Sequence, residues 1–535
     1  HADAPASVPQ PEPASMRPPL REAPPAAARS ARSAGPPEAL APEGRRLSVV
    51  QGGSGSAAAA RNAPRPPGSA ASIPSEQVLA VPVRVLGWNE IYGQYEPPQA
   101  AEQSARCLDC GNPYCEWKCP VHNYIPNWLK LAGEGRIMEA ADLCHETNSL
   151  PEVCGRICPQ DRLCEQACTL QTGFGAVTIG AIERYIVDEA LKQGWRPDLS
   201  QVRPRPWSVG VVGAGPAGLA CADVLTRNGI SVTVYDRYPE IGGLLSFGIP
   251  DFKLELAVMR RRREVLEGAG VLFKLNCEIG RDIQAHELES MHDALFFGMG
   301  TYRPVEAALP GMEQGGIVPA LEFLIGQTSH MYGLDLPGYP HIDLSGERVL
   351  VLGGGDTAMD CVRTAIRQGA ASVHCVYRRD QQNMPGSPRE VKHAMHEGVQ
   401  FEFNAQPVAL VHEDRRLVGL DIVKTRLLPS EDGRARPEII AGSEQRLPAT
   451  ALIFAYGYRP SPPGWLESIG VATDDTGLVT TDPQLAGQTS NPAIFAAGDM
   501  VRGSDLVVTA IADARQTALS IVRYLEIPQP HLKRA

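Results

Sequence analysis

Two glycine-rich turns, each placed directly after a short apolar run, constrain the fold of this chain most strongly. They read Val209-Gly-Val-Val-Gly213-Ala-Gly215-Pro-Ala-Gly218 and Val349-Leu-Val-Leu-Gly353-Gly-Gly355-Asp-Thr-Ala358. A GxGxxG or GxGxxA turn between a strand and a helix is the fingerprint of a dinucleotide-binding βαβ unit. The sequence therefore predicts an α/β fold with two Rossmann-like domains, and glycine-rich turns without a ligand are the alternative.

The first turn has the residues that an FAD site needs. Gly213 permits the tight turn, Gly215 lets the backbone approach a pyrophosphate, and Gly218 lets the helix pack on the strand. The next strand ends at Asp236, whose carboxylate can accept a hydrogen bond from a ribose 2′-hydroxyl and disfavours a 2′-phosphate. We therefore assign this turn to FAD. Further candidates for the flavin site are Pro216, Ala217, Gly243, Leu244 and Lys253.

The second turn differs in the residues that would read the ribose. Its candidate binding residues are Gly353, Gly354, Gly355, Asp356 and Thr357. The following strand ends at Arg378 and Arg379, whose guanidinium groups can fork onto a 2′-phosphate. This pair predicts NADPH rather than NADH, and a solvated strand end is the alternative.

A third segment also points to a flavin. The short apolar run 491–497 ends in Gly498 and Asp499, and a helix is expected to begin near Val508 and Thr509. This ending resembles the second FAD motif of flavoprotein reductases with two dinucleotide domains, the glutathione-reductase-like group. In that group the aspartate binds the ribityl chain. The resemblance extends to two short segments that mark crossings between the domains: 298–301, and Ala455, Tyr456 and Gly457.

Eight of the thirteen cysteines fall in two runs in the N-terminal part of the chain: Cys107, Cys110, Cys115 and Cys119, then Cys154, Cys158, Cys164 and Cys168. Thiolates at such spacings can converge on one iron–sulfur cluster, and a Cys-Pro pair is common in ferredoxin runs. Zinc is the alternative, but it favours paired CxxC sequences, and only one such pair occurs here. We expect two 4Fe–4S clusters. Four thiolates from each run is the plain assignment, whereas a ferredoxin-like exchange would move Cys119 to the other cluster.

The pattern of apolar residues along the 535 residues predicts four parts. Helix-spaced apolar residues occur at 125–143 and 177–191, and strand-like runs occur at 209–212, 232–235, 349–352, 373–377 and 451–456. No Phe, Tyr or Trp precedes Trp88, which predicts disorder there. The predicted parts are a disordered extension (1–84), a helical domain with both clusters (85–205), an FAD domain (206–301 and 459–535) and an NADPH domain (302–458).

Composition argues against several classes of partner. The formal net charge of −11 disfavours binding to nucleic acid or to an anionic membrane. No apolar run approaches the roughly 20 residues of a membrane-spanning helix, and no secretory signal is recognisable at the start. We therefore expect a cytoplasmic protein.

The residues around the cysteines identify a family. Residues 106–126, 150–165 and 505–512 resemble the small (β) subunit of bacterial NADPH-dependent glutamate synthase. The resemblance runs from about residue 84 to the C-terminus, and the N-terminal half of dihydropyrimidine dehydrogenase shares the same plan.

This resemblance implies a crossed set of cluster ligands. One cluster would take Cys107, Cys110, Cys115 and Cys168. The other would take Cys119, Cys158, Cys164 and Glu183, and Cys154 would not be a ligand. From the sequence alone, an ordinary surface carboxylate is the alternative interpretation of Glu183.

The resemblance also implies a function in glutamate biosynthesis and ammonia assimilation. Such a subunit oxidises NADPH through FAD and passes electrons through the clusters to a large (α) subunit, which makes L-glutamate from L-glutamine and 2-oxoglutarate. Hydride transfer between bound cofactors requires no catalytic side chain. Two alternatives remain: a glutamate-synthase-like NADPH:ferredoxin-type oxidoreductase subunit, and a non-catalytic electron-relay scaffold.

Overall fold

The computed structural model describes residues 78–305, 308–429 and 436–527. Residues 1–77 of the expected extension lie outside the described residues. The described chain is ordered before residue 85, because helix α1 (Val81–Arg84) is formed and the Arg84 side chain is buried. A buried guanidinium requires a partner, and Arg84 Nε lies 3.1 Å from a carboxylate oxygen of Glu397. The expected boundary at residue 84 is therefore too late.

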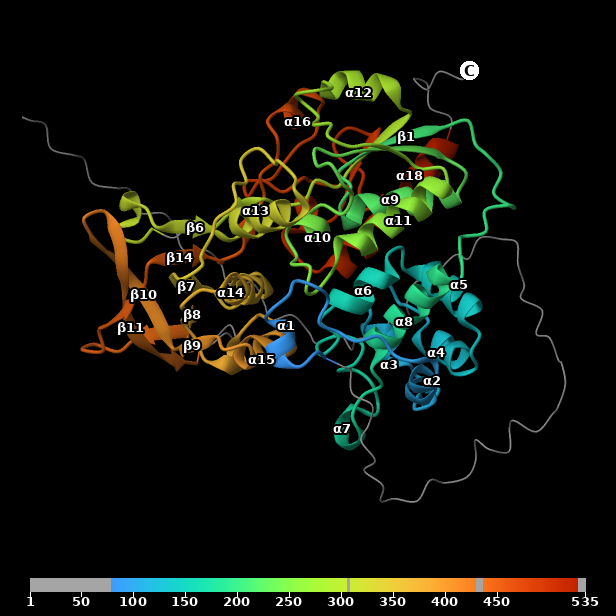
Figure 1. Ribbon diagram of the computed structural model, residues 1–535. Coiled ribbons are helices and arrows are strands. Elements are labelled where there is room, and N and C mark those ends of the chain that lie inside the picture. The colour runs from blue at the N-terminus through green and yellow to red at the C-terminus, as the bar shows by residue number, and fades with distance from the viewer. Residues whose placement is uncertain (1–77, 306–307, 430–435, 528–535) are drawn as a thin grey trace, which may run out of the picture. The chain divides into compact units, whose positions relative to one another are not determined.

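An all-α domain follows, as the cysteine-rich region predicts (Figure 1). Its central helix, α8 (Ile179–Lys192), is buried along most of its length and packs against α4, α5 and α6. The other helices are α2 (Pro97–Ser104), α3 (Tyr114–Lys118), α4 (Ile125–Gly133), α5 (Ile137–Thr147), α6 (Pro151–Ile157) and α7 (Gln171–Phe174). The fully buried Trp128 lies in the core that these helices share.

The single helix expected over 125–143 is divided in two. Helix α4 ends at Gly133 and α5 begins at Ile137. Between them Gly135 has a φ of 74°, a left-handed conformation that glycine adopts without steric cost. The apolar spacing continues across this turn because both helices bury their apolar faces in one core, and this hides the break from a reading of periodicity.

The first dinucleotide-binding sheet is fully parallel, with strand order β16-β4-β1-β2-β3. Its strands are β1 (Ser208–Val212), β2 (Ser231–Tyr235), β3 (Leu272–Lys274), β4 (Ala294–Phe297) and β16 (Ile494–Ala496). Helices α9 (Pro216–Arg227) and α18 (Val507–Glu526) pack against each other in its core. None of the helices in the described part of the chain is long and apolar enough to cross a membrane.

The second sheet repeats this plan with strand order β6-β14-β7-β8-β9, again parallel. Its strands are β6 (Ile317–Pro319), β7 (Arg348–Leu352), β8 (Ser372–Tyr377), β9 (Gln400–Phe403) and β14 (Ala451–Phe454). Helices α13 (Ala320–Tyr332), α14 (Asp356–Gln368) and α15 (Pro388–His396) accompany it. An antiparallel sheet of β10 (Ala405–Glu413), β11 (Arg416–Leu428), β12 (Arg436–Ile439) and β13 (Gln445–Pro448) is inserted before β14 (Figure 1).

The chain crosses between the two sheets at one short ribbon. Strand β5 (Arg303–Pro304) leaves the first sheet and pairs antiparallel with β15 (Tyr458–Arg459), which returns from the second. Strand β16, which follows β15 in the chain, then joins β4 in the first sheet. The second sheet is thus an insertion within the first, in agreement with the predicted fold class of two Rossmann-like domains behind a helical domain.

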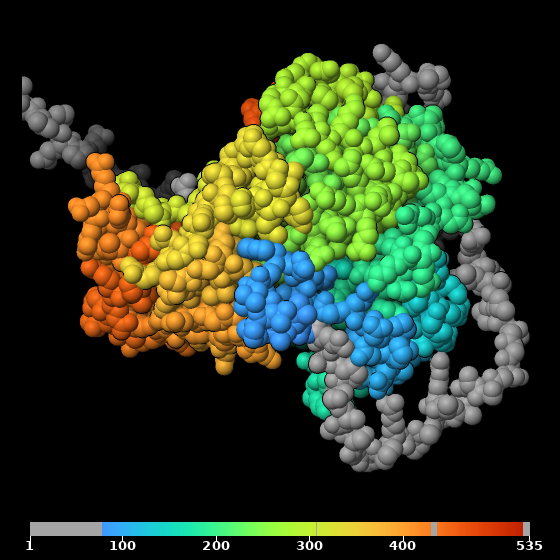
Figure 2. All heavy atoms as spheres, viewed as in Figure 1, coloured from blue at the N-terminus to red at the C-terminus, as the bar shows by residue number. Residues whose placement is uncertain are grey.

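The segment before the helical domain lies against the second dinucleotide domain. Figure 2 shows it in blue beside the yellow and orange part of the chain. Tyr92 donates a hydrogen bond to Glu390 of α15 at 2.9 Å, and Arg84 pairs with Glu397. Phe252 of the first dinucleotide domain also contacts the second one, since its ring lies under the guanidinium groups of Arg363 and Arg367 in α14.

The helical domain and the first sheet meet at a buried ion pair. Arg262 of α11 (Leu256–Gly268) donates two hydrogen bonds of 2.6 Å to the carboxylate of Glu152 in α6. Both side chains are 1% exposed. Arg262 also donates to Nε2 of His145 at 2.9 Å, and burial together with the Arg262 charge holds the pKa of His145 well below its usual value.

Breaking this pair is expected to destabilise the interface between the helical domain and the first sheet. The substitution Arg262→Met leaves the Glu152 charge buried without a partner, which typically costs about 3–5 kcal/mol. We expect the thermal unfolding midpoint of the cofactor-loaded protein, measured by calorimetry, to fall by about 5–10 °C. The double variant with Glu152→Gln removes the stranded charge and is expected to recover part of the loss. A midpoint unchanged in Arg262→Met would contradict a stabilising role for the pair.

Candidate functional site

The first glycine-rich turn has the geometry that its sequence predicts. Gly213 has a φ of 101°, and a Cβ there would lie 2.5 Å from the carbonyl oxygen of Gly298. A Cβ on Gly218 would lie 1.8 Å from the carbonyl oxygen of Gly213. By contrast, a Cβ on Gly215 would meet no protein atom within 4 Å, so the space beside this residue is open to a ligand. Helix α9 begins immediately afterwards, at Pro216.

A cavity at this turn, which we call the first-loop cavity, collects most of the predicted flavin residues. Its lining includes Gly213, Gly215, Pro216, Ala217, Asp236, Gly243, Leu244 and Asp499. Gly218 packs beneath the turn instead, Gly498 lies against Ala217, and the Thr509 hydroxyl donates to the carbonyl of Leu506 in the first turn of α18. Backbone amides and a helix N-terminus suit the phosphates of a dinucleotide.

Asp236 lies at the end of β2, where the fingerprint requires an acid. Its Oδ2 accepts a hydrogen bond of 2.6 Å from the backbone N–H of Ala214, and its Oδ1 accepts one of 2.8 Å from that of Tyr238. Burial raises the pKa of Asp236, although these two bonds oppose the rise. The two backbone bonds fix the carboxylate at the cavity wall.

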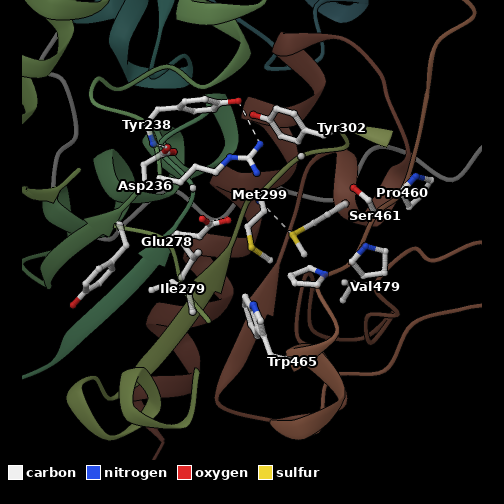
Figure 3. A pocket seen from close by; sticks show the side chains of 18 of the residues that line it. Asp236, Tyr238, Glu278, Ile279, Met299, Tyr302, Pro460, Ser461, Trp465 and Val479 are labelled. Atoms are coloured by element: carbon white, nitrogen blue, oxygen red, sulfur yellow. Dashed lines mark hydrogen bonds between the residues drawn. The ribbon is translucent and has the colours of Figure 1, made fainter. Parts of the chain in front are cut away.

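A neighbouring cavity, which shares Asp236 with the first, contains residues that the sequence reading missed (Figure 3). Arg237 lies over the rings of Tyr238 and Tyr302, with its guanidinium carbon 5.0 Å and 4.5 Å from their centroids. Met299 and Trp465 line the same cavity further down. Met299 belongs to the segment 298–301 that the family resemblance marks as a domain crossing, whereas the other side chains come from separate segments with no shared motif. Only the position of Arg237, directly after Asp236, could have drawn attention to it.

Asp499 follows β16 and lines the first-loop cavity as well as a second one. Gly498 has a φ of 74°, which turns the chain sharply before α17 (Asp499–Arg502). Burial raises the pKa of Asp499 to about 6. The expected motif is therefore formed, and its acid lies where two cavities meet.

The second glycine-rich turn repeats the geometry of the first. Gly353 has a φ of 144°, and a Cβ there would lie 2.3 Å from the carbonyl oxygen of Ala455. A Cβ on Gly354 would press on the ring of Tyr377 at 2.6 Å, whereas one on Gly355 would meet nothing within 4 Å. As in the first turn, the open position directly precedes the helix, here α14 at Asp356.

The arginine pair after β8 is only partly bound by protein. Arg378 is exposed. Burial raises the pKa of Tyr456 to about 12, and the positive charge of Arg378 opposes this rise. The Nε of Arg379 is buried and has no hydrogen-bond partner among the described residues. The predicted strand over 451–456 ends at Phe454. Ala455 instead covers the glycine turn, and Gly457 takes a φ of 94°.

One cavity joins all three domains, and we call it the shared cavity. Its lining includes Cys158 of the helical domain, Leu244, Lys253 and Asp499 of the first dinucleotide domain, and Asp356, Thr357, Asp360 and Glu390 of the second. Lys253 Nζ lies 2.8 Å from Asp360 and 3.6 Å from Glu390. Burial opposes its charge, but the two carboxylates outweigh this effect and raise the pKa of Lys253. Sequence reading found Lys253 without these partners.

Four thiols of the helical domain face one small cavity. Its lining includes Cys107, Cys110, Cys115 and Cys168. Burial raises the pKa of the Cys115 thiol to about 12, and the charges of Cys107 and Cys168 act in the same direction. The structure thus brings together the set that the resemblance implies, in preference to four thiols from one run. Thiolates in such a set are the usual ligands of a 4Fe–4S cluster.

A second group forms around Glu183 of α8. Burial raises the pKa of the Cys119 thiol to about 12, with a smaller contribution from Glu183. Burial raises the pKa of Cys164 well above its usual value, and Cys119 and Glu183 add to this. A hydrogen bond with Cys154 and burial hold the pKa of Cys158 well above its usual value, and Glu183 and Cys119 add smaller contributions in the same direction. These mutual effects require the four side chains to lie near one another.

Glu183 is buried, so the surface interpretation of this residue is wrong. Its Oε1 accepts hydrogen bonds from the side-chain amides of Asn123 at 2.9 Å and Asn148 at 3.2 Å. Its Oε2 accepts none from the described residues. Burial raises the pKa of Glu183 to about 8. One oxygen is thus held in place while the other is open to a ligand.

The other six cysteines are outside the two ligand sets that the resemblance implies. Cys154 is buried and hydrogen-bonds the Cys158 thiol. Cys144, Cys221, Cys361 and Cys375 are in the core, whereas Cys277 is half-buried beside Asp236. No group of three or more His, Cys, Asp or Glu residues within the described ranges is arranged to hold a single metal ion.

Two protein families account for the chain from residue 84 onward. Residues 84–195 match the family of dihydropyrimidine dehydrogenase domain II, 4Fe-4S cluster. Residues 207–514, more than half of the chain, match the pyridine nucleotide-disulphide oxidoreductase family. The order of these matches, with the 4Fe–4S family ahead of the dinucleotide-binding family, is the order that the sequence predicts.

Several curated proteins are similar over most of the chain. The glutamate synthase (NADPH) small chain of Halomonas elongata is 58% identical over 83% of this chain and 94% of its own length. The protein of the same name from Escherichia coli is 57% identical over 83% of this chain and 95% of its own. The putative oxidoreductase AegA of Escherichia coli is 54% identical over 84% of this chain, but over only 69% of its own length.

Solved structures resemble the two dinucleotide-binding domains. Mycobacterium tuberculosis FprA in complex with NADPH superposes with a TM-score of 0.51 and 20% identity, over 60% of this chain and 85% of that one. At this identity the likeness concerns the fold. Together with the high identity of the curated relatives over nearly their full length, the two matched domains show that the chain belongs to the glutamate synthase (NADPH) small-chain family.

Proposed function

We propose that the chain is the NADPH-oxidising subunit of a glutamate synthase. It takes electrons from NADPH, passes them through FAD and two 4Fe–4S clusters, and delivers them to a large (α) subunit. The observation that carries this proposal is the shared cavity. It is bordered by Asp356 of the second glycine turn, Asp499 of the flavin motif and Cys158 of the cysteine block.

The two glycine turns would divide the dinucleotides between them. Asp236 accepts hydrogen bonds at the first turn and carries a charge that repels a 2′-phosphate, so this site suits FAD. Arg378 and Arg379 follow β8 of the second sheet, and the exposed Arg378 supports an anion there. The second site therefore suits NADPH. We place the reaction in the cytoplasm, where thiols are kept reduced.

The chain's own residues would orient the reactants rather than react with them. When bound, FAD supplies the conversion of a hydride into single electrons, and the clusters supply one-electron carriers. Lys253 is fixed between Asp360 and Glu390, which hold the two dinucleotide domains at one cavity. The ion pairs keep the geometry that hydride transfer requires.

The positions of the two thiol groups support a direction of transfer. Cys158 borders the shared cavity, so the group containing Cys119, Cys158, Cys164 and Glu183 is the first outlet for electrons. Cys107, Cys110, Cys115 and Cys168 line a different cavity and are all half-buried, so we place their group after the first in the order of transfer. Both groups together would form a path from the shared cavity toward the surface of the helical domain.

The outer end of this path has the character of a docking face. Leu108, Tyr114, Trp117 and Phe174 are each more than half exposed. Leu108 and Tyr114 also line the cavity of the first thiol group. Exposed apolar clusters of this kind mark protein–protein contacts. A glutamate synthase large subunit that covers these residues would receive electrons where the path ends.

A second candidate is a glutamate-synthase-like oxidoreductase that serves another acceptor. The 54% identity to the putative oxidoreductase AegA favours it, since that protein has additional length outside the matched region. A non-catalytic relay is the third reading. The intact second turn and the Arg378 and Arg379 pair argue for NADPH turnover instead.

The second thiol group gives a test of its proposed carboxylate ligand. In Glu183→Ala the cofactor-loaded chain is expected to lose about half of its iron and the electron paramagnetic resonance signal of one cluster. The matched control is Cys154→Ser, because this thiol is buried beside Cys158 but is not a proposed ligand. We expect the control to keep both signals. Full iron in Glu183→Ala with loss in Cys154→Ser would make Cys154 the ligand.

The arginine pair gives a test of cofactor choice. Replacing both Arg378 and Arg379 by alanine removes two charge-assisted contacts to a 2′-phosphate. We expect kcat/KM for NADPH, with ferricyanide as acceptor, to fall about 100-fold while that for NADH changes little. Arg426→Ala, which removes an exposed arginine paired with Glu438 in the antiparallel sheet, is the control. Equal losses with both cofactors would show that the pair does not read the 2′-phosphate.

The proposed function is tested by mixing the cofactor-loaded chain with a candidate glutamate synthase large subunit. Alone, the chain is expected to oxidise NADPH with ferricyanide and to make no glutamate. With the large subunit, NADPH oxidation is expected to depend on both glutamine and 2-oxoglutarate. Absence of ferricyanide activity would contradict an NADPH-oxidising role. Ferricyanide activity without any response to the large subunit would favour the AegA-like reading.

A further inference from the structure

The loop that follows Cys158 also contacts the second dinucleotide domain directly. Asp161 and Arg162 belong to the helical domain, between the thiols of Cys158 and Cys164. Among the described residues, their side chains make no hydrogen bond within the helical domain. Instead both reach the segment 384–389 of the second dinucleotide domain. We call these two residues the clasp.

Asp161 caps a helix that belongs to the other domain. Helix α15 begins at Pro388, and its own N-cap residue, Ser387, makes no side-chain capping bond. The Ser387 hydroxyl donates instead to Asp161 at 3.0 Å, and the backbone N–H of Arg389 donates to the same oxygen at 3.3 Å. A carboxylate at a helix N-terminus satisfies free N–H groups and stabilises the helix dipole.

Arg162 holds the backbone immediately before that helix. Its guanidinium donates to the carbonyl oxygens of Met384, Pro385 and Gly386. Three successive carbonyl groups bound by one planar, rigid donor group fix the path of this segment. Lysine could not make this contact in the same way, because its ammonium is a point charge on a flexible stem.

The segment that the clasp holds supports the second glycine turn. The backbone N–H of Gly386 donates to the carbonyl oxygen of Gly354 at 2.8 Å. The backbone N–H of Ser387 donates to Oδ1 of Asp356, also at 2.8 Å. A Cβ on Gly386 would lie 2.9 Å from the Gly354 oxygen, so the two segments are in direct backbone contact.

These contacts form one continuous chain of hydrogen bonds. It runs from the loop of Cys158 and Cys164, through the clasp, to residues 384–387 and on to the glycine turn at 354–356. We propose that Asp161 and Arg162 are positioning residues for NADPH, because they hold the second glycine turn in its binding conformation from the cysteine-bearing loop. This inference rests on the proposed assignment of NADPH to that turn.

The clasp explains how the two sites can be kept in register. The glycine turn must present its backbone to the phosphates while the nicotinamide end reaches the shared cavity. Asp356 and Ser387 both line that cavity, as does Cys158. Because the clasp belongs to the loop that follows Cys158, it fixes the second glycine turn relative to Cys158, which borders the same cavity.

The test uses the cofactor-loaded full chain and a redox-inactive probe, 2′,5′-ADP, which carries the 2′-phosphate and a 5′-phosphate without a nicotinamide. Dissociation constants are measured by calorimetric titration for wild type, Arg162→Ala and Asp161→Ala. We expect each alanine variant to bind the probe about tenfold more weakly. The conservative variant Asp161→Asn keeps both acceptor bonds and should stay within about threefold of wild type. Arg162→Lys should resemble Arg162→Ala.

A steady-state measurement separates positioning from damage to the reaction itself. With ferricyanide as acceptor, KM for NADPH should rise about tenfold in the alanine variants while kcat stays within about twofold. Arg446→Ala, in an exposed Arg–Asp pair of the antiparallel sheet, is the matched control and should change neither constant. A fall in kcat with unchanged KM, or an equal loss in Arg446→Ala, would overturn the proposal.

A double-mutant cycle keeps the proposal testable if Arg162→Ala loses its cofactors. Ser387→Ala removes the hydroxyl that donates to Asp161 from the other domain, and it leaves the cysteine loop intact. If the two act through their shared bond, the Asp161→Ala/Ser387→Ala double variant should bind the probe no more weakly than Asp161→Ala alone. Additive losses would overturn the proposal. Wild-type protein that fails to bind 2′,5′-ADP would instead refute the assignment of NADPH to this turn.

Discussion

The buried ion pair between Lys253 and Asp360 is the interaction on which the functional geometry depends. It joins the first dinucleotide domain to the second at 2.8 Å, in a place where an unpaired charge would be costly. Because the pair lies at the shared cavity, it holds the second glycine turn and Asp499 of the flavin motif at the same space. Cys158 enters this space from the third domain.

Much of this arrangement was predictable because the signals are local. The glycine turns, the strands before them and the acid at Asp236 lie within short βαβ units, whose geometry is fixed by backbone sterics. The structure accordingly has Gly213 and Gly353 in matching positions, each beneath a carbonyl group. The ferredoxin pattern suggested that Cys119 changes cluster, but the complete crossed set came only from the family resemblance. Spacing alone left open whether Cys168 joins the first run or the second.

The rest depends on contacts between distant segments. Nothing in the local sequence around Glu183 indicates that Asn123 and Asn148 meet it in the core. The helix break at Gly135 is hidden because both halves bury their apolar faces together. Residues 78–84 are held in part by the ion pair of Arg84 with Glu397, more than three hundred residues away. Such pairs follow from the assembled fold, which periodicity cannot report.

The central claim is that electrons leave the flavin through the cluster proposed to be held by Cys158 together with Cys119, Cys164 and Glu183. The most direct measurement is the flavin absorbance in stopped flow, in complex with a large subunit, for wild type and Cys158→Ser. The account predicts that NADPH bleaches the flavin at the same rate in both. Reoxidation after addition of glutamine and 2-oxoglutarate should be at least about tenfold slower in the variant. Reoxidation at the wild-type rate without Cys158 would contradict the account.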